Sequence, residues 1–208
     1  MQLAIIDYSI GNIQSIINAL SNHDLKIIVT SNEKDIIESD AVILPGVGAF
    51  KKAMEELEKR RLPSILDSYI KTKKPILGIC LGMQLLLENS TEFGKTKGLG
   101  FCNGEVIKFP KSTKAKLPHV SWNSLDKGNQ DWDSGLLETI KTDDDFYFVH
   151  SYICNPPEEN ILAYSNYGGI KFCAALRKNN IYGCQFHPEK SSLLGLKILS
   201  NFIKIAEK

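Results

Sequence analysis

The chain has 208 residues, 43% of them hydrophobic and 24% charged, and its formal net charge is +1. This composition excludes a disordered or fibrous protein, and a chain of this length buries a sizeable core without disulfides or a metal. The near-neutral charge provides no broad basic surface for nucleic acid, and no apolar run approaches the ~20 residues of a membrane span. We therefore expect neither nucleic acid nor a membrane as a partner.

The N-terminus and the cysteines indicate a cytoplasmic protein. The first residues, MQLAIIDYSIGN, lack the basic region of a signal peptide and reach Asp7 almost at once. The five cysteines are scattered without a CxxC pair, which favours reduced thiols over a disulfide framework or a zinc site. We therefore expect no metal and no cofactor, and a cysteine that is free to react.

In the first half of the chain, short apolar runs alternate with helical patterns. The expected strands are residues 2–8, 26–30, 41–45 and 74–80, and the expected helices are residues 13–20, 49–70 (with a break or fresh start near Pro63) and 83–88. Because these strands are almost continuously apolar, the alternation predicts a parallel sheet covered by helices on both faces.

The second half has a different pattern of apolar and turn residues. Short β-like segments at 104–109, 146–153, 161–167, 172–178 and 181–186 are separated by Gly, Asn, Asp and Pro turns, which suggests antiparallel additions to the parallel core. The polar stretch 124–135 is expected to be a surface loop, and residues 193–205 the closing helix. Without a repeat or linker, residues 1–208 are predicted to form a single α/β domain.

Cys80 is the centre of the sequence GICLG, residues 78–82, between an expected buried strand and a helix. This is the G-x-nucleophile-x-G elbow with cysteine in place of serine, and its glycines avoid collisions in a sharp turn. Unpaired N–H groups at the helix start favour a thiolate, and the N–H of Leu81 points to where an oxyanion would form. The alternative, a small core cysteine, is preferred for Cys102, Cys154, Cys173 and Cys184.

A cysteine nucleophile needs a base, and His187 is the best placed of the histidines. Pro188 follows it and holds it in an extended conformation. Residues two apart in an extended chain point to the same side, so Glu189 can face the imidazole and fix its tautomer. His-Pro-Glu alone is more often an ordinary turn, but beside a cysteine elbow it forms a credible Cys80–His187–Glu189 triad. The order of its members differs from that of the α/β-hydrolases.

A second glycine-rich segment, LPGVGAF at 44–50, follows another expected parallel strand. Ligand sites in open α/β sheets gather at the carboxyl ends of strands. The two glycines let backbone N–H groups turn inward, which offers a second oxyanion donor at Val47 or Gly48. The alternative is a simple strand-terminating turn. The segment is not a phosphate loop, because it lacks Gly-Lys-Ser/Thr.

Taken together, LPGVGAF, GICLGMQ and QFHPEKS resemble the class I (triad) glutamine amidotransferases. DYSIGN, LPHVSWNSL and FYFVHSY add a resemblance to the glutaminase subunits of imidazole glycerol phosphate synthases. The resemblance implies a flavodoxin-like core and an enzyme that hydrolyses glutamine to glutamate and ammonia through a Cys80 thioester. The ammonia would be channelled to a separate (β/α)8-barrel synthase subunit, as a heterodimer of histidine biosynthesis.

The resemblance also assigns residues around the triad. Gln84, four residues past the nucleophile, matches the residue that grips glutamine, and Ser151 and Tyr152 match the segment whose backbone holds the amino-acid end of the substrate. His150 is then a neighbour of the site and not a second base. The positions that match the partner-facing side are Asn12, Trp122, Asn123, Tyr147 and Lys190.

The catalytic motifs show no departure from the family, but the segments that match the partner-facing side do. The family usually has glycine where this chain has Ser9 and Ser121, and a basic residue is expected where it has Gln14. An amidotransferase subunit that supplies another acceptor, such as an enzyme that amidinates surface sugars, is therefore an alternative.

Two further alternatives are a thiol hydrolase on the same fold and a non-catalytic interaction module. Gln84 and the HSY segment argue against the first, and the complete triad argues against the second. A separate hypothesis concerns control of the glutaminase, in which the oxyanion segment reaches its active orientation only when the partner docks.

Overall fold

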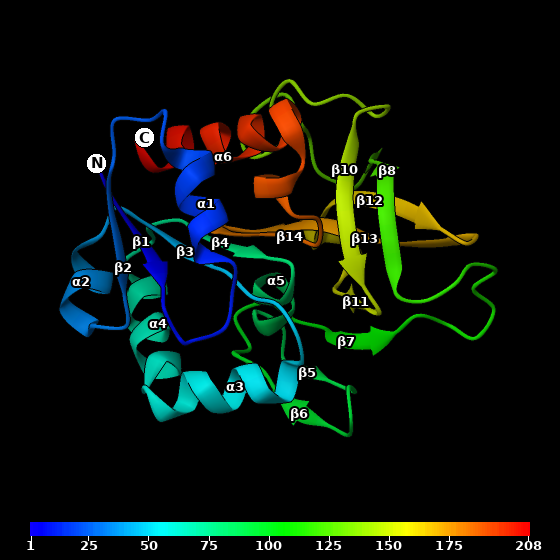
Figure 1. The fold of residues 1–208 in the computed structure, drawn as a ribbon, viewed down its shortest axis with the longest axis horizontal. Coiled ribbons are helices and arrows are strands. Elements are labelled where there is room, and N and C mark those ends of the chain that lie inside the picture. Colours follow the sequence, from blue (N-terminus) through cyan, green and yellow to red (C-terminus); the bar gives the residue numbers. More distant parts are fainter.

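The computed structural model describes residues 1–208 as a large mixed sheet, a two-stranded ribbon and six α-helices (Figure 1). The helices are α1 (Ile13–Leu20), α2 (Glu33–Glu38), α3 (Phe50–Lys59), α4 (Leu62–Lys71), α5 (Leu81–Leu85) and α6 (Ser192–Ala206), with short 3-10 turns η1 (Glu158–Asn160) and η2 (Pro188–Lys190). None of the helices is long and apolar enough to cross a membrane.

The strands of the first half are β1 (Gln2–Ile6), β2 (Lys26–Thr30), β3 (Ala41–Leu44), β4 (Ile76–Ile79), β5 (Asn89–Ser90) and β6 (Thr96–Lys97). Those of the second half are β7 (Glu105–Lys108), β8 (His119–Ser124), β9 (Asp126–Lys127), β10 (Asp145–His150), β11 (Tyr152–Asn155), β12 (Ile161–Tyr167), β13 (Ile170–Lys178) and β14 (Ile181–Cys184).

The sheet changes from parallel to antiparallel at β14. The parallel part has the order β2-β1-β3-β4-β14, so the last strand of the chain is a neighbour of β4. On its other side β14 is antiparallel to β13, and the sheet continues through β11 and β7. This arrangement confirms the predicted parallel core with antiparallel additions.

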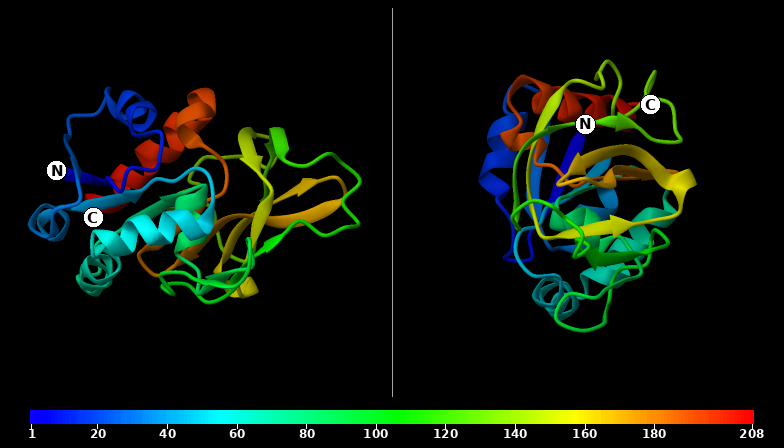
Figure 2. Two further views of the ribbon diagram at one scale, coloured as in Figure 1. Left: turned by 60° about the horizontal axis from the view of Figure 1, so that its bottom comes forward. Right: turned by 90° about the vertical axis from the view of Figure 1, so that its right-hand side faces the viewer.

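The two faces of the sheet carry separate cores. Successive residues of a strand point to opposite faces, so on β1 Leu3 and Ile5 belong to one cluster and Ala4 and Ile6 to the other. Helices α1 and α6 cover the first face, and α3 and α4 cover the second, as Figures 1 and 2 show. The expectation of helices on both faces is therefore confirmed.

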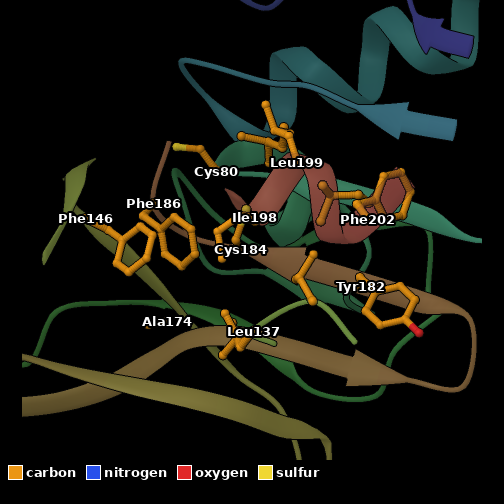
Figure 3. Packing of buried hydrophobic residues seen from close by; sticks show 14 of the residues in the cluster. Cys80, Leu137, Phe146, Ala174, Tyr182, Cys184, Phe186, Ile198, Leu199 and Phe202 are labelled. Atoms are coloured by element: carbon orange, nitrogen blue, oxygen red, sulfur yellow. The ribbon is translucent and has the colours of Figure 1, made fainter. Parts of the chain in front are cut away.

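The first cluster reaches the end of β14. Figure 3 shows Phe202 of α6 beside Tyr182 of β14, whose ring centroids are 6.3 Å apart, and Ile198 above Cys184. Phe186, just beyond the strand, is fully buried in the same cluster. These contacts hold the segment after β14 firmly against the rest of the molecule.

The expected helix over 49–70 is two helices, α3 and α4. They meet at a turn where Arg61 adopts a left-handed φ of 56°, and Pro63 lies in the first turn of α4, which confirms the expected fresh start. The expected helix at 83–88 begins two residues earlier, directly after Cys80. Helix α2 was not anticipated, because its six residues are too few to show a clear period.

Two expectations in the second half are wrong. The apolar segment 146–153 is not one strand, because the chain turns at Ser151, so that β10 pairs with β8 in the ribbon and β11 joins the main sheet. The polar segment 124–135 is not wholly a surface loop. It contains β9, and Trp132 is buried there with its indole Nε1 donating to the carbonyl of Leu162 at 2.7 Å. Trp132 and the fully buried Leu125 anchor the otherwise polar stretch to the core.

Candidate active site

Three parallel strands end at the same edge of the sheet and bring the motifs together. Strand β3 leads into the segment 45–49, β4 into Cys80, and β14 into the segment 185–189. The carboxyl ends of parallel strands share one edge, which is where open α/β sheets bind ligands. The three motifs are far apart in the chain, and the pairing of β4 with both β3 and β14 makes them neighbours.

Cys80 occupies a strained turn between β4 and α5. Its φ is 53° and its ψ is −110°, and its N–H donates to the carbonyl of Cys184 at 2.8 Å. A Cβ on Gly82 would lie 1.9 Å from the carbonyl oxygen of Leu44, and one on Gly78 would lie 2.7 Å from backbone atoms of Gly82. Only glycine fits at these two positions, because Gly82 is in backbone contact with the end of β3 and Gly78 with the first turn of α5.

His187 and Glu189 form a buried ion pair beside this elbow. Nδ1 of His187 is 2.7 Å from Oε1 of Glu189, and both side chains are 2% exposed. His187 is extended, and its N–H donates to the carbonyl of Tyr147 at 2.9 Å. The hydroxyl of Ser191 donates to the carbonyl of His187 and accepts from the N–H of Tyr147. Strand β10 thereby fixes the backbone that carries the imidazole.

The electrostatics of His187 favour its charged form. Burial lowers its pKa, but the Cys80 and Glu189 side chains outweigh burial and raise the pKa to about 10. Since Nδ1 donates to Glu189, the other nitrogen, Nε2, is the one available for proton exchange. This nitrogen is buried without a hydrogen-bond partner, and Cys80 is the neighbour that acts on it. The raised pKa gives the neutral imidazole a high affinity for a proton, which suits a base that takes one from the thiol and is then held as an imidazolium.

A cavity of about 270 Å³ opens in front of the cysteine and the histidine. Its volume suits a ligand of amino-acid size rather than a larger cofactor. It is lined by Val47, Gly48, Cys80, Leu81, Gln84, Glu92, Pro118, Val149, His150, Ser151, Tyr152 and His187. All the expected oxyanion and substrate-binding residues are among them, whereas Glu189 lies behind His187 and outside the lining.

Glu92 is a lining residue that the sequence did not single out. It lies between β5 and β6, and one carboxylate oxygen accepts from the N–H of Phe50 at the start of α3 at 2.6 Å. It is the only acidic side chain in the lining, so it is the natural partner for a positively charged group of a ligand. No local motif surrounds it, and nothing in the sequence pattern distinguishes it from a solvated surface glutamate.

His150 lines the cavity and forms a buried pair with His119. Nδ1 of His150 is 2.8 Å from the carbonyl oxygen of Tyr152, and its Nε2 is 3.0 Å from Nδ1 of His119. Burial lowers the pKa of His150 to about 3 and also lowers the pKa of His119. Both rings are therefore neutral at pH 7. Because a carbonyl only accepts, His150 carries its proton on Nδ1 and is held as a structural neighbour of the site.

Of the residues expected to face a partner, Trp122, Asn123 and Tyr147 lie on the ribbon of β8 and β10, while Lys190 and Asn12 lie outside it. Trp122 is 49% exposed, and its ring is 6.0 Å from that of Tyr147 on the neighbouring strand. Asn123 donates to the carbonyl of Asn166 at 2.9 Å. Asn12 is half-buried at the start of α1, and Lys190 is exposed at the end of η2.

The two serines that depart from the family both make contacts. Ser9 has a left-handed φ of 65°, and its hydroxyl accepts from Nη2 of Arg60 at 2.7 Å. The hydroxyl of Ser121 lies 2.9 Å from Nε2 of His119 and 2.6 Å from Oδ1 of Asn123. Ser121 therefore belongs to a polar cluster on β8 with His119 and Asn123, while the Gln14 side chain bonds to Asn18 on its own helix.

Comparison with known proteins gives one family. A family model described as Glutamine amidotransferase class-I matches residues 4–206. The chain is 44% identical over 204 residues to "Imidazole glycerol phosphate synthase subunit HisH 1" of Campylobacter jejuni subsp. jejuni serotype O:23/36, covering 98% of this chain and 100% of the relative. It is 47% identical over 207 residues to "Imidazole glycerol phosphate synthase subunit HisH" of Bacillus cereus, covering 99% and 95%.

Solved structures share the fold at low identity. A putative gmp synthase subunit a protein from Thermoplasma acidophilum superimposes with a TM-score of 0.70 at 20% identity, covering 100% of this chain and 94% of that one. PurLQS from Thermotoga maritima gives a TM-score of 0.72 at 16% identity, covering 98% and 97%. These likenesses confirm the expected fold class.

Proposed function

This chain belongs to the class-I glutamine amidotransferase family, and on that basis we propose that it is the glutaminase subunit of an imidazole glycerol phosphate synthase in histidine biosynthesis. The observation that carries the proposal is a cysteine on a strained elbow that shares a cavity with a buried His–Glu pair. Relatives that are 44% and 47% identical to this chain, over nearly their whole length, bear the name of that subunit.

In the proposed first step, the sulfur of Cys80 attacks the side-chain amide carbon of glutamine. His187 takes the thiol proton on Nε2, and Glu189 stabilises the resulting imidazolium. The carbonyl oxygen becomes an oxyanion that accepts hydrogen bonds from the N–H of Leu81 and from the Val47–Gly48 segment. When the C–N bond breaks, His187 returns the proton to the departing nitrogen, which leaves as ammonia and a glutamyl thioester remains.

In the second step, water hydrolyses the thioester. His187 removes a proton from the water, the hydroxide adds to the acyl carbon, and the thiolate of Cys80 leaves and regains the proton. Glutamate is the other product. The same imidazole serves as base and acid in both steps, which requires the fixed orientation that Glu189 and the backbone contact with Tyr147 support.

The proposed substrate contacts follow from the chemistry of the lining. Gln84 uses its Nε2 for both of its side-chain hydrogen bonds, to Tyr152 and Gln185, which leaves its oxygen for a donor on glutamine. The carboxylate of Glu92 suits the α-ammonium group, and the backbone at Ser151 and Tyr152 suits the α-carboxylate. A single cavity thereby offers a complementary group for each end of glutamine.

The ribbon of β8 and β10 is the proposed contact with a separate (β/α)8-barrel synthase subunit in the cytoplasm. The exposed Val120 and Trp122 form an apolar strip on β8, beside the cavity that Val149 of β10 lines. Ammonia that escapes into water at neutral pH is protonated and lost as a nucleophile, so a direct transfer to the partner has a clear use. Gly48 has a φ of 88°, and no atom lies within 4 Å of the position that a Cβ would take, which supports the hypothesis that the oxyanion segment reorients on docking.

The test is glutamine-dependent activity of the complex purified from the source cells. Both termini lie at the end of the molecule remote from the ribbon, so an affinity tag leaves that face free (Figure 1). An electrophilic glutamine analogue should label Cys80. In the complex, Cys80→Ala should abolish formation of the synthase product from glutamine but retain its formation from ammonium salts. Cys102→Ala, a change at another buried thiol, is the matched control.

Two outcomes would count against different parts of the proposal. Glutamine hydrolysis that survives Cys80→Ala would overturn the catalytic assignment. Co-purification of an acceptor enzyme other than a cyclase barrel, such as one that amidinates surface sugars, would overturn the histidine-pathway assignment and leave the glutaminase assignment intact.

A further inference from the structure

We propose that Gln185 is a further catalytic residue, whose side-chain amide donates a hydrogen bond to the sulfur of Cys80 and stabilises the thiolate. Nε2 of Gln185 lies 3.7 Å from Sγ of Cys80, within the range of hydrogen bonds to sulfur. The inference rests on the proposed role of Cys80 as the nucleophile and adds a group to that site. Neither the triad nor the oxyanion donors include it.

The orientation of the Gln185 amide is set by a chain of hydrogen bonds. Nε2 of Gln84 lies 3.2 Å from the carbonyl oxygen of Tyr152, and a carbonyl can only accept, so this atom of Gln84 must be the amide nitrogen. The same nitrogen lies 3.0 Å from Gln185, which must therefore present its oxygen, Oε1, to Gln84. The other end of the Gln185 amide, the NH2 group, then faces the sulfur.

The backbone leaves Gln185 little freedom to adopt another position. It directly follows β14, its N–H donates to the carbonyl of Ala174 at 2.8 Å, and its side chain is fully buried. A buried amide that lost its partners would be costly, so the side chain holds its orientation whether or not a ligand is bound. It is two residues before His187, and both residues reach Cys80 from the same segment.

The surroundings of the sulfur show why a donor is useful. The other close polar group is the carbonyl of Val149, 3.9 Å from Sγ, which can accept from a thiol but repels a thiolate. The titratable side chains close enough for a charge on Cys80 to act on them are His187 after β14, Tyr8 after β1, Cys154 on β11 and Cys184 on β14. Of these only His187 can be positive, and it loses its positive charge when it gives its proton to ammonia.

Gln185 can act at two points of the proposed cycle. The sulfur is negative before it attacks, and it is negative again when it leaves the thioester during hydrolysis. A neutral donor stabilises the negative sulfur at both points without exchanging a proton, because an amide N–H is not acidic in this range. Gln185 therefore complements His187, which supplies and removes the proton.

The experiment measures the rate at which iodoacetamide alkylates Cys80 in the full chain between pH 5 and pH 10. Peptide mass spectrometry separates Cys80 from the other cysteines, and no glutamine is present. Gln185→Met keeps the volume but removes the donor, and we expect alkylation at pH 7 to be about tenfold slower, as for the loss of one charge-assisted hydrogen bond. The rates of variant and parent should converge at high pH, where the thiolate forms without help.

Two further variants make the result specific. Gln84→Met removes the group that orients Gln185, so we expect a smaller loss at pH 7. Gln130→Met is the matched control, because that amide also donates to two carbonyls, those of Glu159 and Arg177, but lies outside the cavity. Its alkylation profile should be that of the parent.

A Gln185→Met profile that superimposes on the parent profile would overturn the proposal. A loss by the same factor at every pH would also overturn it, because that result indicates disturbed packing. If the Met variant does not fold, Gln185→Glu keeps the acceptor for Gln84 and removes the donor, and it should also slow alkylation at pH 7. Alkylation requires no glutaminase activity, so failure here is distinct from failure of the proposed function.

Discussion

Gly82→Ala is the substitution for which the structure gives the sharpest expectation. An added Cβ would lie 1.9 Å from the carbonyl oxygen of Leu44, and ordinary contact begins at 3.4 Å, so the end of β3 and the elbow must separate by about 1.5 Å (3.4 minus 1.9). Both partners are backbone, and no side chain can turn away to relieve the contact. The change therefore moves the segment after β3 relative to Cys80.

The expected cost has two parts. Overpacking of this kind lowers the free energy of unfolding by about 1–3 kcal/mol, or roughly 2–12 °C in Tm for a chain of this size. A displacement of about 1 Å in a catalytic arrangement lowers the rate by about 100-fold. Because the two proposed oxyanion donors lie on the two separated segments, we expect the loss mainly in kcat.

Glutamine hydrolysis and thermal unfolding, measured on the same preparation, test both parts. Gly135→Ala is the control, since Gly135 has a φ of 91° with nothing within 4 Å of an added Cβ. The Gly135→Ala substitution strains the backbone by about 1–2 kcal/mol but does not change the active site, so the kcat of this variant should equal that of the parent. A Gly82→Ala variant with the kcat and Tm of the parent would refute the argument from backbone contact.

Three other predictions concern the triad, the histidine pair and the ribbon. Glu189→Gln keeps a hydrogen bond to His187 but removes the charge that supports the imidazolium, so kcat should fall about 10²–10⁴-fold, and an unchanged kcat would contradict this role. The pKa of His150 is lowered to about 3, so below pH 6.5 the unfolded chain binds a proton that the folded chain does not, and stability decreases as pH falls through that window. Between pH 7 and pH 5, urea unfolding of His150→Gln should show roughly 2 kcal/mol less loss of stability than the parent, whereas equal losses would contradict the assignment. Trp122→Ala should weaken binding to the co-purified partner by about 2 kcal/mol, while Val29→Ala, at an exposed apolar residue on the edge strand β2, should bind as the parent does.

The parallel half of the fold could be predicted because its signals are local. Four nearly continuous apolar strands and their helices appear in the sequence as short windows, and the glycines around Cys80 follow from the steric demands of a single turn. The separation of β10 from β11 could not be predicted. The apolar pattern continues through Ser151. The chain leaves the ribbon there and enters the main sheet only because β10 pairs with β8 and β11 pairs with β7.

The same distinction applies to the site. His187 and Glu189 are two residues apart, so their contact follows from the geometry of an extended chain. Glu92 and Gln185 reach the cavity and Cys80 through contacts between segments far apart in the sequence, and neither residue has a local pattern that marks it. Contacts of this kind depend on which strands become neighbours, and periodicity does not encode that information.

The position of β14 in the sheet has a consequence for the order of synthesis and folding. Gly78 and Cys184 are in contact although they are 106 positions apart, so the pairing of β4 with β14 is among the most non-local steps in the chain. Pairings of such long range form late, and the N-terminal part of a chain leaves the ribosome first. We therefore expect the thiol of Cys80 to exist for most of translation without His187, its proposed base. If the proposed triad is correct, reactivity arises only when the last strand inserts, and an incomplete chain carries the proposed nucleophile but releases no ammonia.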